Sequence, residues 1–108
     1  MKAIVFHAQA RDAVRAFPRD IRDRLGKALF LLQMGVQPGL PLSRPMPSVA
    51  PGGAELRLRG DDGQFRVFYL VASEEGVLLL HAFQKKTQQT PAAEIALARR
   101  RLKEMQNE

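Results

Sequence analysis

Basic side chains recur in the second half of the chain at spacings that suit phosphate binding. In the segment ELRLR, strand alternation places Glu55, Arg57 and Arg59 on one side of the backbone. Arg66 follows in the next segment of strand character, QFRVFYLV. If these two strands pair in a suitable register, Arg57 and Arg66 converge on one face of a sheet. Two such guanidinium groups can clamp a phosphodiester and stabilise the charge that develops on it in a transition state.

Groups able to transfer protons lie close to these arginines in the sequence. Cleavage of RNA without a metal ion requires activation of the 2′-hydroxyl, stabilisation of the pentavalent phosphorane and protonation of the 5′-oxygen. The arginines suit the second task. His81, Glu55, Lys85 and Lys86 carry groups that suit the other two, provided that the pKa of a lysine is lowered. The pattern does not assign the general acid and the general base among them.

Ordinary structural roles are open for the same residues. Arg57 and Arg66 also suit cross-strand ion pairs with carboxylates such as that of Glu55. His81 lies in an apolar strand, which is typical of a hydrogen-bonded core histidine. The two lysines that follow suit the solvated end of a strand. We further expect Arg66 at a strand edge, where its removal would cost little stability.

The length and charge of the chain fit one small basic domain over residues 1–108, with a net charge of +6. The excess charge comes from residues 11–27 and 85–108, which each carry six basic and three acidic side chains. Such a surface attracts polyanions such as nucleic acid. A solvated basic surface without a polyanionic partner is the ordinary alternative.

Several kinds of chemistry are excluded or disfavoured. The absence of cysteine excludes disulfides and thiolate chemistry. His7 and His81 are the two histidines, and no carboxylate pattern accompanies them, so we expect neither a metal ion nor another cofactor. No segment approaches the roughly 18 apolar residues that span a bilayer. We therefore expect a cytoplasmic protein without a membrane partner.

The N-terminal third predicts one strand followed by two helices. Residues 2–6 (KAIVF) are β-branched and apolar, which is typical of a strand. A weak amphipathic pattern over residues 7–17 indicates a short helix, and Pro18 suits the first turn of a second one, which we expect to stop at Gly35. Apolar residues recur in that second helix with helical spacing. They are Ile21, Leu25, Ala28, Leu29 and Leu32.

The middle of the chain predicts a loop and then an antiparallel meander. Residues 36–53 hold five of the seven prolines, so we expect a connector without regular structure. Three segments of strand character follow, separated by turns that end in glycine. They are ELRLR (residues 55–59), QFRVFYLV (64–71) and VLLLHAF (77–83). We expect Tyr69 and Phe83 in the core.

The last element is a helix for which Thr90 suits the N-cap and Pro91 the first helical position. Its apolar stripe leaves the basic residues, Arg101 among them, mostly facing solvent. The whole order is β-α-α-β-β-β-α, which predicts an α+β fold. We expect an antiparallel sheet with the two N-terminal helices packed on one face, a C-terminal helix, and the other face partly open.

Four stretches resemble the RelE/ParE toxin superfamily, and most of all its phage-derived, HigB-type branch. Members of that branch read E-L-R, then G-x-[YF]-R-V-F-Y, then L-L-H-x-F-x-K-K-T-x-x-T-P-x-x-E-I. The matching stretches here are Glu55-Leu56-Arg57, Gly63 to Tyr69, Leu79 to Thr87, and Thr90-Pro91 with Glu94-Ile95. The order and spacing of the motif make the resemblance specific, and the expected order of elements extends it over most of the remaining chain.

The resemblance implies a toxin of a type II toxin–antitoxin pair that cuts mRNA in the ribosomal A site without a metal ion. Its implied partner is a cognate antitoxin, a small helix-turn-helix protein from the adjacent gene, which blocks the toxin by direct binding. The implied active-site positions are Arg57, Arg66, His81, Lys85 and Lys86, with the two arginines on the scissile phosphate. Further candidates for contact with RNA are Arg59, Glu55 and Arg44.

One departure from the family pattern leaves other functions open. Relatives often carry a lysine just before E-L-R, where this chain has Ser48-Val49-Ala50, and Arg44 is the nearest cation upstream. A weaker nuclease, or one that uses Arg44 instead, would fit this difference. The alternatives are a gyrase-inhibiting toxin of the ParE type and a phage-derived protein that only binds its partner.

Overall fold

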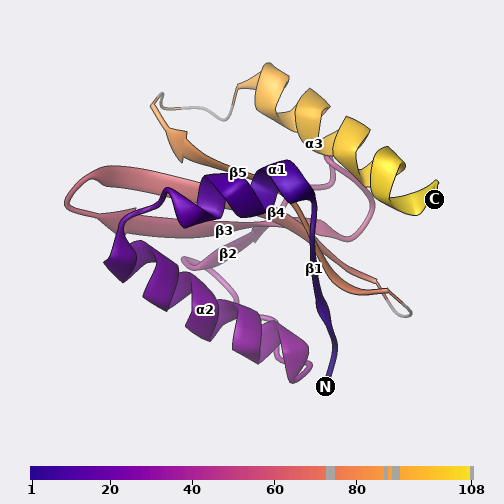
Figure 1. The fold of residues 1–108 in the computed structure, drawn as a ribbon, viewed down its shortest axis with the longest axis horizontal. Coiled ribbons are helices and arrows are strands. Elements are labelled where there is room, and N and C mark those ends of the chain that lie inside the picture. Colours follow the sequence, from indigo (N-terminus) through magenta and orange to yellow (C-terminus); the bar gives the residue numbers. More distant parts are fainter. Residues whose placement is uncertain (73–74, 87, 89–90, 108) are drawn as a thin grey trace.

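The computed structural model describes residues 1–72, 75–86, 88 and 91–107, and it has the α+β fold that the sequence predicts. Three helices pack against one five-stranded sheet with strand order β1-β5-β4-β3-β2 (Figure 1). The helices are α1 (Ala8–Arg15), α2 (Arg19–Gln33) and α3 (Ala92–Gln106). The strands are β1 (Ile4–Phe6), β2 (Ser43–Pro45), β3 (Gly53–Gly60), β4 (Gly63–Ala72) and β5 (Gly76–Lys85). No helix in these described ranges is long and apolar enough to cross a bilayer.

The sheet is mixed, whereas the sequence predicted an antiparallel one. β1 runs parallel to β5, with Ile4 opposite Val77 and Phe6 opposite Leu79. The three-residue strand ends where α1 begins, so the two N-terminal helices carry the chain across the sheet before the meander starts. The meander β3-β4-β5 is antiparallel as predicted.

The proline-rich segment contains a strand that the sequence analysis missed. β2 pairs antiparallel with the start of β3, and the register sets Arg44 opposite Glu55. A three-residue strand with proline at its end lacks the alternation that marks a strand, and an outer strand tolerates the missing N–H group. The segment after β2 is also more than a connector, because Met46, Val49 and Ala50 are buried.

Helices cover both faces of the sheet: the two N-terminal helices pack on one face, as expected, and the C-terminal helix packs on the other. α1 and α2 pack on the face formed by Leu56, Leu58, Val67 and neighbouring apolar residues. α3 and the segment around Met46 cover part of the opposite face. Figure 1 shows α3 set apart from α1 and α2, and the free end of the β3-β4 hairpin reaching beyond it. That end of the second face is open.

Two helix starts lie one residue later than the sequence predicts. Pro18 and Pro91 occupy the N-cap positions of α2 and α3, so both precede the first helical residue. The extended backbone of each proline fits this position as well as it fits the first turn. Thr90, expected as the N-cap of α3, and residues 73–74 of the second turn lie outside the described residues.

A break in the register between β4 and β5 decides which side chains share the second face. Phe68 lies opposite His81 and Tyr69 lies opposite Leu79, so Leu80 is an extra residue on β5. Such a bulge reverses the alternation of the strand beyond it. Leu79 therefore packs under α1 and α2, whereas His81 faces the other way, toward Phe68.

Candidate functional site

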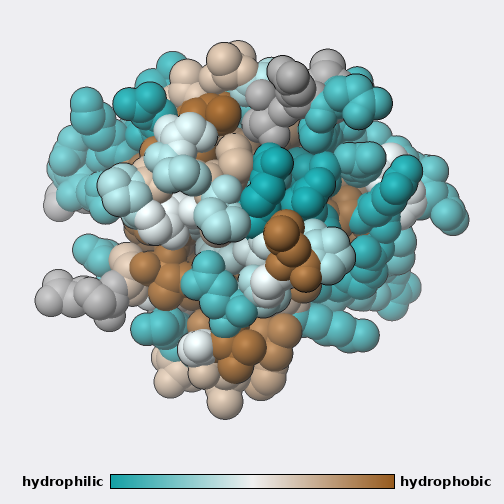
Figure 2. All heavy atoms as spheres, turned by 180° about the vertical axis from the view of Figure 1, so that it is seen from behind, coloured by the Kyte–Doolittle hydropathy of each residue, from teal (hydrophilic) through white to brown (hydrophobic). Residues whose placement is uncertain are grey.

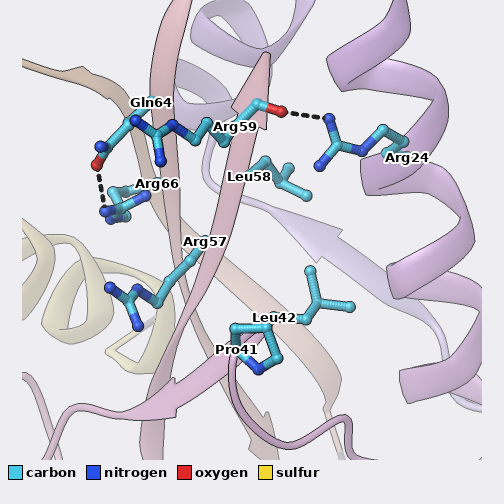
Figure 3. Close-up of a pocket in the computed structure, with 8 residues that line it drawn as sticks. All are labelled: Arg24, Pro41, Leu42, Arg57, Leu58, Arg59, Gln64 and Arg66. Atoms are coloured by element: carbon cyan, nitrogen blue, oxygen red, sulfur yellow. Dashed lines mark hydrogen bonds between the residues drawn. The ribbon is translucent and has the colours of Figure 1, made fainter.

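The candidate site begins with two arginines that the register of β3 and β4 places side by side. Arg57 lies directly opposite Arg66. Their side chains leave the same face of the sheet, and Figure 3 shows both guanidinium groups on one side of β3 with Leu58 on the other. Two cations held opposite each other repel, so this arrangement needs a nearby negative charge.

Glu55 supplies that charge from beneath the arginines. Its side chain is fully buried, and its Oε1 accepts a hydrogen bond from Arg44 Nη2 at 3.1 Å. Arg66 Nε lies 3.6 Å from Oε2, and Arg57 Nε lies 4.0 Å from Oε1. One carboxylate thus faces three guanidinium groups, and the cluster carries an excess of positive charge.

Arg66 is the most enclosed member of the cluster. It lies on β4, which has neighbours on both sides, and its side chain is 4% exposed, so the expected position at a strand edge is wrong. Gln64 accepts a hydrogen bond from Arg66 Nη2 at 2.7 Å. Burial lowers the pKa of Arg66, Glu55 opposes this, and Arg57 and Arg44 add to the lowering. These neighbours therefore hold the guanidinium group of Arg66 in one orientation.

An open pocket adjoins these arginines at the end of the hairpin. Its lining includes cations from three strands and the chain that follows β5: Arg57, Arg59, Arg66, Lys85 and Lys86. A second hollow continues around the edge of β3, between Arg24, Pro41 and the same arginines (Figure 3). Seen from behind, hydrophilic side chains gather over the side of the molecule where the hairpin ends (Figure 2).

Lys85, like Arg66, lines this pocket and has a lowered pKa. Lys85 lies on β5 opposite Gln64 of β4 and is half-buried, whereas Lys86 is exposed. Burial lowers the pKa of Lys85, and the positive charge of Arg66 lowers it further. Both effects favour the neutral amine, which is the form that accepts a proton.

His81 lies on the same sheet face but beneath α3, outside this pocket. Its side chain is 7% exposed, its Nε2 lies 3.0 Å from Glu94 Oε1, and its Nδ1 lies 2.8 Å from Arg101 Nη1. Because Arg101 can only donate, Nδ1 accepts, and Nε2–H then donates to Glu94. Burial lowers the pKa of His81, and Glu94 opposes the shift. Both ring nitrogens are engaged, as expected of a core histidine.

A family model described as "Phage derived protein Gp49-like" matches residues 12–103, which is most of the chain. The chain belongs to this Gp49-like family. No curated protein matches its sequence.

A solved structure also resembles the Gp49-like chain in fold. It is titled "Crystal structure of the intact E. coli RelBE toxin-antitoxin complex", and one of its chains superposes with a TM-score of 0.60 at 16% identity. The match covers 81% of the Gp49-like chain and 100% of the other. At this identity the likeness concerns the fold, which is α+β of the RelE kind.

The structure brings together five of the candidates on the Gp49-like chain and separates three. Arg57, Arg59, Arg66, Lys85 and Lys86 line the open pocket. Glu55 and Arg44 lie behind them, and the full burial of Glu55 removes it from direct contact with RNA. His81 instead contacts Glu94 and Arg101 of α3.

Two residues with a part in this arrangement, Arg101 and Gln64, escaped sequence reasoning. Arg101 is 8% exposed, which corrects the expectation that it faces solvent, and it reaches His81 and Gln9. Its spacing of three from Ala98 was a usable sign that it lies on the buried stripe. Gln64 was overlooked because its role depends on the rotamer of Arg66. The described residues contain no cluster of three or more histidine and carboxylate side chains that could hold a metal ion.

Proposed function

We propose that the Gp49-like chain is the toxin of a type II toxin–antitoxin pair and cleaves mRNA on the ribosome without a metal ion. The observation that carries the proposal is the pair Arg57 and Arg66, held opposite each other beside Lys85 in an open pocket. The motif of the HigB-type branch supports it, because its basic positions coincide with the lining of this pocket. The site of action would be the cytoplasm, where ribosomes carry the substrate.

The arginine pair suits a scissile phosphate. Arg57 and Arg66 reach the pocket from adjacent strands, so their guanidinium groups can bind two non-bridging oxygens at once. Their charge is in place before the reaction, which favours the more negative phosphorane over the ground state. Glu55 acts from behind as a positioning residue, because its buried carboxylate holds the arginines in direction.

The ordinary alternative, in which the arginines are only ion pairs, accounts for part of this arrangement. Arg57 and Arg66 do pair with Glu55, but Arg44 uses the same carboxylate through its shorter contact. Three guanidinium charges share the buried carboxylate of Glu55, and the pocket lining adds Arg59 and Lys86 against one carboxylate, Asp61. A purely structural ion pair needs no such excess, whereas an anionic ligand does.

Proton transfer is the natural role of Lys85. Among the candidates it combines a place in the pocket with a lowered pKa, which comes from burial and from Arg66. A neutral Lys85 amine can take the proton of the 2′-hydroxyl as general base. The exposed Lys86 and Arg59 would then bind phosphates on either side of the cleaved bond, and Arg44 supports the cluster through Glu55.

An antitoxin partner completes the proposal. The superposed structure is titled as a toxin–antitoxin complex, and the chain matches one of its members along that member's whole length. We propose that a small helix-turn-helix protein encoded by the adjacent gene binds this chain and blocks the basic pocket. Co-expression of that protein should restore growth to cells that express the chain.

Induced expression of the chain alone tests the proposed activity. We expect growth arrest and new mRNA 5′ ends within translated codons, mapped by sequencing of transcript ends. Arrest with double-strand DNA breaks and intact transcripts would instead indicate the gyrase-inhibiting alternative. Normal growth in the presence of folded protein would indicate a protein that only binds its partner.

The substitution Lys85→Arg tests the assignment of the base. It keeps a positive charge in the pocket but removes an amine that can lose its proton. Because the neutral amine is the active form, wild-type cleavage of mRNA on programmed ribosomes should accelerate as the pH rises through the lowered pKa of Lys85. The variant should be slower by about 100-fold and lose this pH dependence. An unchanged pH–rate profile would assign the base elsewhere.

A further inference from the structure

Three aromatic rings form a cluster, each in contact with the other two, on the sheet face that carries the basic pocket. The rings of His81 and Phe83 are stacked, with centroids 5.0 Å apart and planes at 22°. Phe68 contacts both edge-on, at 6.1 Å from His81 and 5.4 Å from Phe83. Phe68 belongs to β4, whereas His81 and Phe83 follow each other along β5, from the part under α3 toward the open end of the β3-β4 hairpin.

Burial distinguishes Phe83 from the other two rings. Phe68 is fully buried and His81 is 6% exposed, whereas Phe83 is half-buried at the border of the core under α3. This corrects the expectation of a simple core position. Of the three rings, Phe83 is the one that reaches solvent to an appreciable extent.

Phe83 lies next to two cations of the basic pocket, although it is not itself among the residues that line it. His81 stacks against one face of the ring. Beyond the bulge, alternation along β5 places Lys85 next to Phe83 on the same side of the sheet, in the direction away from His81. Arg66 lies directly opposite Phe83 on β4. A flat apolar surface therefore adjoins one group that suits a phosphate, Arg66, and the proposed general base, Lys85.

This combination has the chemistry of a nucleotide subsite. Single-stranded RNA is bound by aromatic rings on sheet surfaces, on which bases stack, together with cations that hold the backbone. Every base has a flat face, so such a platform positions a nucleotide with little dependence on its sequence. The backing of Phe83 by His81 and Phe68 fixes the ring before the base arrives, which lowers the cost of binding.

We propose that Phe83 is a stacking platform for the base of a nucleotide next to the phosphate that Arg57 and Arg66 hold. The ligand class is a single-stranded RNA segment with at least one unstacked base. The cleavage arm of its test rests on the proposed ribonuclease function, and a binding arm does not. The buried His81 then has a part in the site as the support of this ring, without touching the substrate.

Cleavage on programmed ribosomes measures the effect of the base. The substrates are one mRNA and matched copies with an abasic nucleotide at each position of the A-site codon. Phe83→Leu keeps apolar packing but removes the ring, and we expect it to slow cleavage of the intact mRNA by about 5- to 100-fold. One abasic position should slow the wild type similarly and cause no further loss in Phe83→Leu. Phe83→Tyr, the matched control, should cleave at close to the wild-type rate.

Two results of this arm would overturn the proposal. One is wild-type cleavage by Phe83→Leu, as expected of a ring that only fills the core. The other is a set of losses that multiply when Phe83→Leu meets each abasic substrate, because the ring would then act through Lys85 or Arg66 and not through a base. Thermal unfolding of each variant confirms that equal amounts of folded protein are compared.

Fluorescence provides the arm that is independent of cleavage. The chain contains no tryptophan, so Phe83→Trp introduces a single indole reporter at the platform. A short 2′-O-methyl RNA, which cannot be cleaved, should quench this fluorescence at low salt, and an oligomer of abasic nucleotides should not. Equal or absent quenching by the two would overturn the stacking subsite. Base-dependent quenching without any cleavage by the wild type would support the subsite and count against the ribonuclease function instead.

Discussion

Two clusters on one face of the sheet are built from similar parts but differ in how their charges are balanced. At the hairpin, one carboxylate, Glu55, faces three arginines beside an open pocket. Beneath α3, His81 bonds to both Glu94 and Arg101, so one acidic and one basic side chain share it, although the buried Arg101 Nε has no hydrogen-bond partner among the described residues. The first, the open cluster, keeps positive charge that its carboxylate does not balance. The second, the closed cluster, uses its polar contacts to hold α3.

This difference distinguishes the proposed binding site from a structural contact more clearly than residue type does. His81 is the kind of residue that general acid–base catalysis uses most often, yet its position makes it part of the attachment of α3. Lys85 is a less usual proton acceptor, but it lies in the pocket and its pKa is lowered. Positive charge that neighbouring carboxylates do not balance indicates where an anionic ligand would bind.

Loss of Arg66 tests the open cluster most severely. We expect Arg66→Ala to reduce mRNA cleavage on programmed ribosomes by about 100-fold or more, because it removes a fixed cation from the developing charge. It should also destabilise the fold, since the side chain is buried against Glu55.

Rates per folded protein separate these two effects of Arg66→Ala. Arg66→Lys is the matched variant, because it keeps the charge but loses the planar fork. It should recover more stability than activity. A folded Arg66→Ala protein that cleaves mRNA at the wild-type rate would contradict the assignment of the open cluster as the site of cleavage.

The carboxylate beneath the arginines is expected to matter mainly for stability. Glu55→Gln leaves Arg44, Arg57 and Arg66 without their shared counter-charge, and breaking a buried pair in this way costs about 3–5 kcal/mol. We expect the lower end of this range, since Arg44 and Arg57 are partly exposed and can turn to water. Urea unfolding measures the loss.

An added anion gives a sharper readout of the same cluster. Sulfate should stabilise Glu55→Gln more than the wild type, because it can take the place of the missing charge. Asp62→Asn is the control, as it removes an exposed carboxylate of the same hairpin that does not line the pocket and should change the free energy of unfolding by less than about 0.5 kcal/mol. Equal stabilisation by sulfate in all three proteins would show that the arginines do not bind an anion.

The contribution of the closed cluster to the free energy of unfolding should depend on pH. Burial lowers the pKa of His81 despite Glu94, while Arg101 and His7 add to the lowering. Below about pH 6.5 the unfolded chain binds a proton that the folded chain does not, so acidification destabilises the protein until the lowered pKa is reached. The contribution is complete at neutral pH.

Substitution of the histidine isolates this contribution. His81→Gln cannot titrate, and its stability should fall less steeply than that of the wild type between pH 7 and the lowered pKa, measured by urea unfolding at a series of pH values. At neutral pH the variant should also be less stable, because one of the two polar contacts of α3 at this position is lost. Identical pH slopes would mean that His81 is not held neutral in the fold.

The sequence predicts the two clusters unequally. Alternation in ELRLR and QFRVFYLV predicted that Arg57 and Arg66 share a face if the hairpin register is suitable, and the observed register meets this condition. It could not show that Glu55 is buried, since that depends on β2, a strand too short and too rich in proline to recognise. The bulge at Leu80 also leaves no sign in an apolar run, and without it the faces of His81 and Leu79 cannot be told apart.

The exposed rim of the open cluster should show the smallest effect. Arg59 lies on the pocket lining with an exposed side chain, and Arg24 bonds to its backbone carbonyl, which the substitution retains. Arg59→Ala should slow cleavage only about 2- to 5-fold at moderate salt and lower the salt dependence of RNA binding by about one counter-ion. Arg11→Ala removes an exposed arginine from α1, on the covered face, and should leave both quantities unchanged. Equal effects of the two variants would mean that RNA senses only the net charge, and the distinction between the hairpin and the rest of the basic surface would fail.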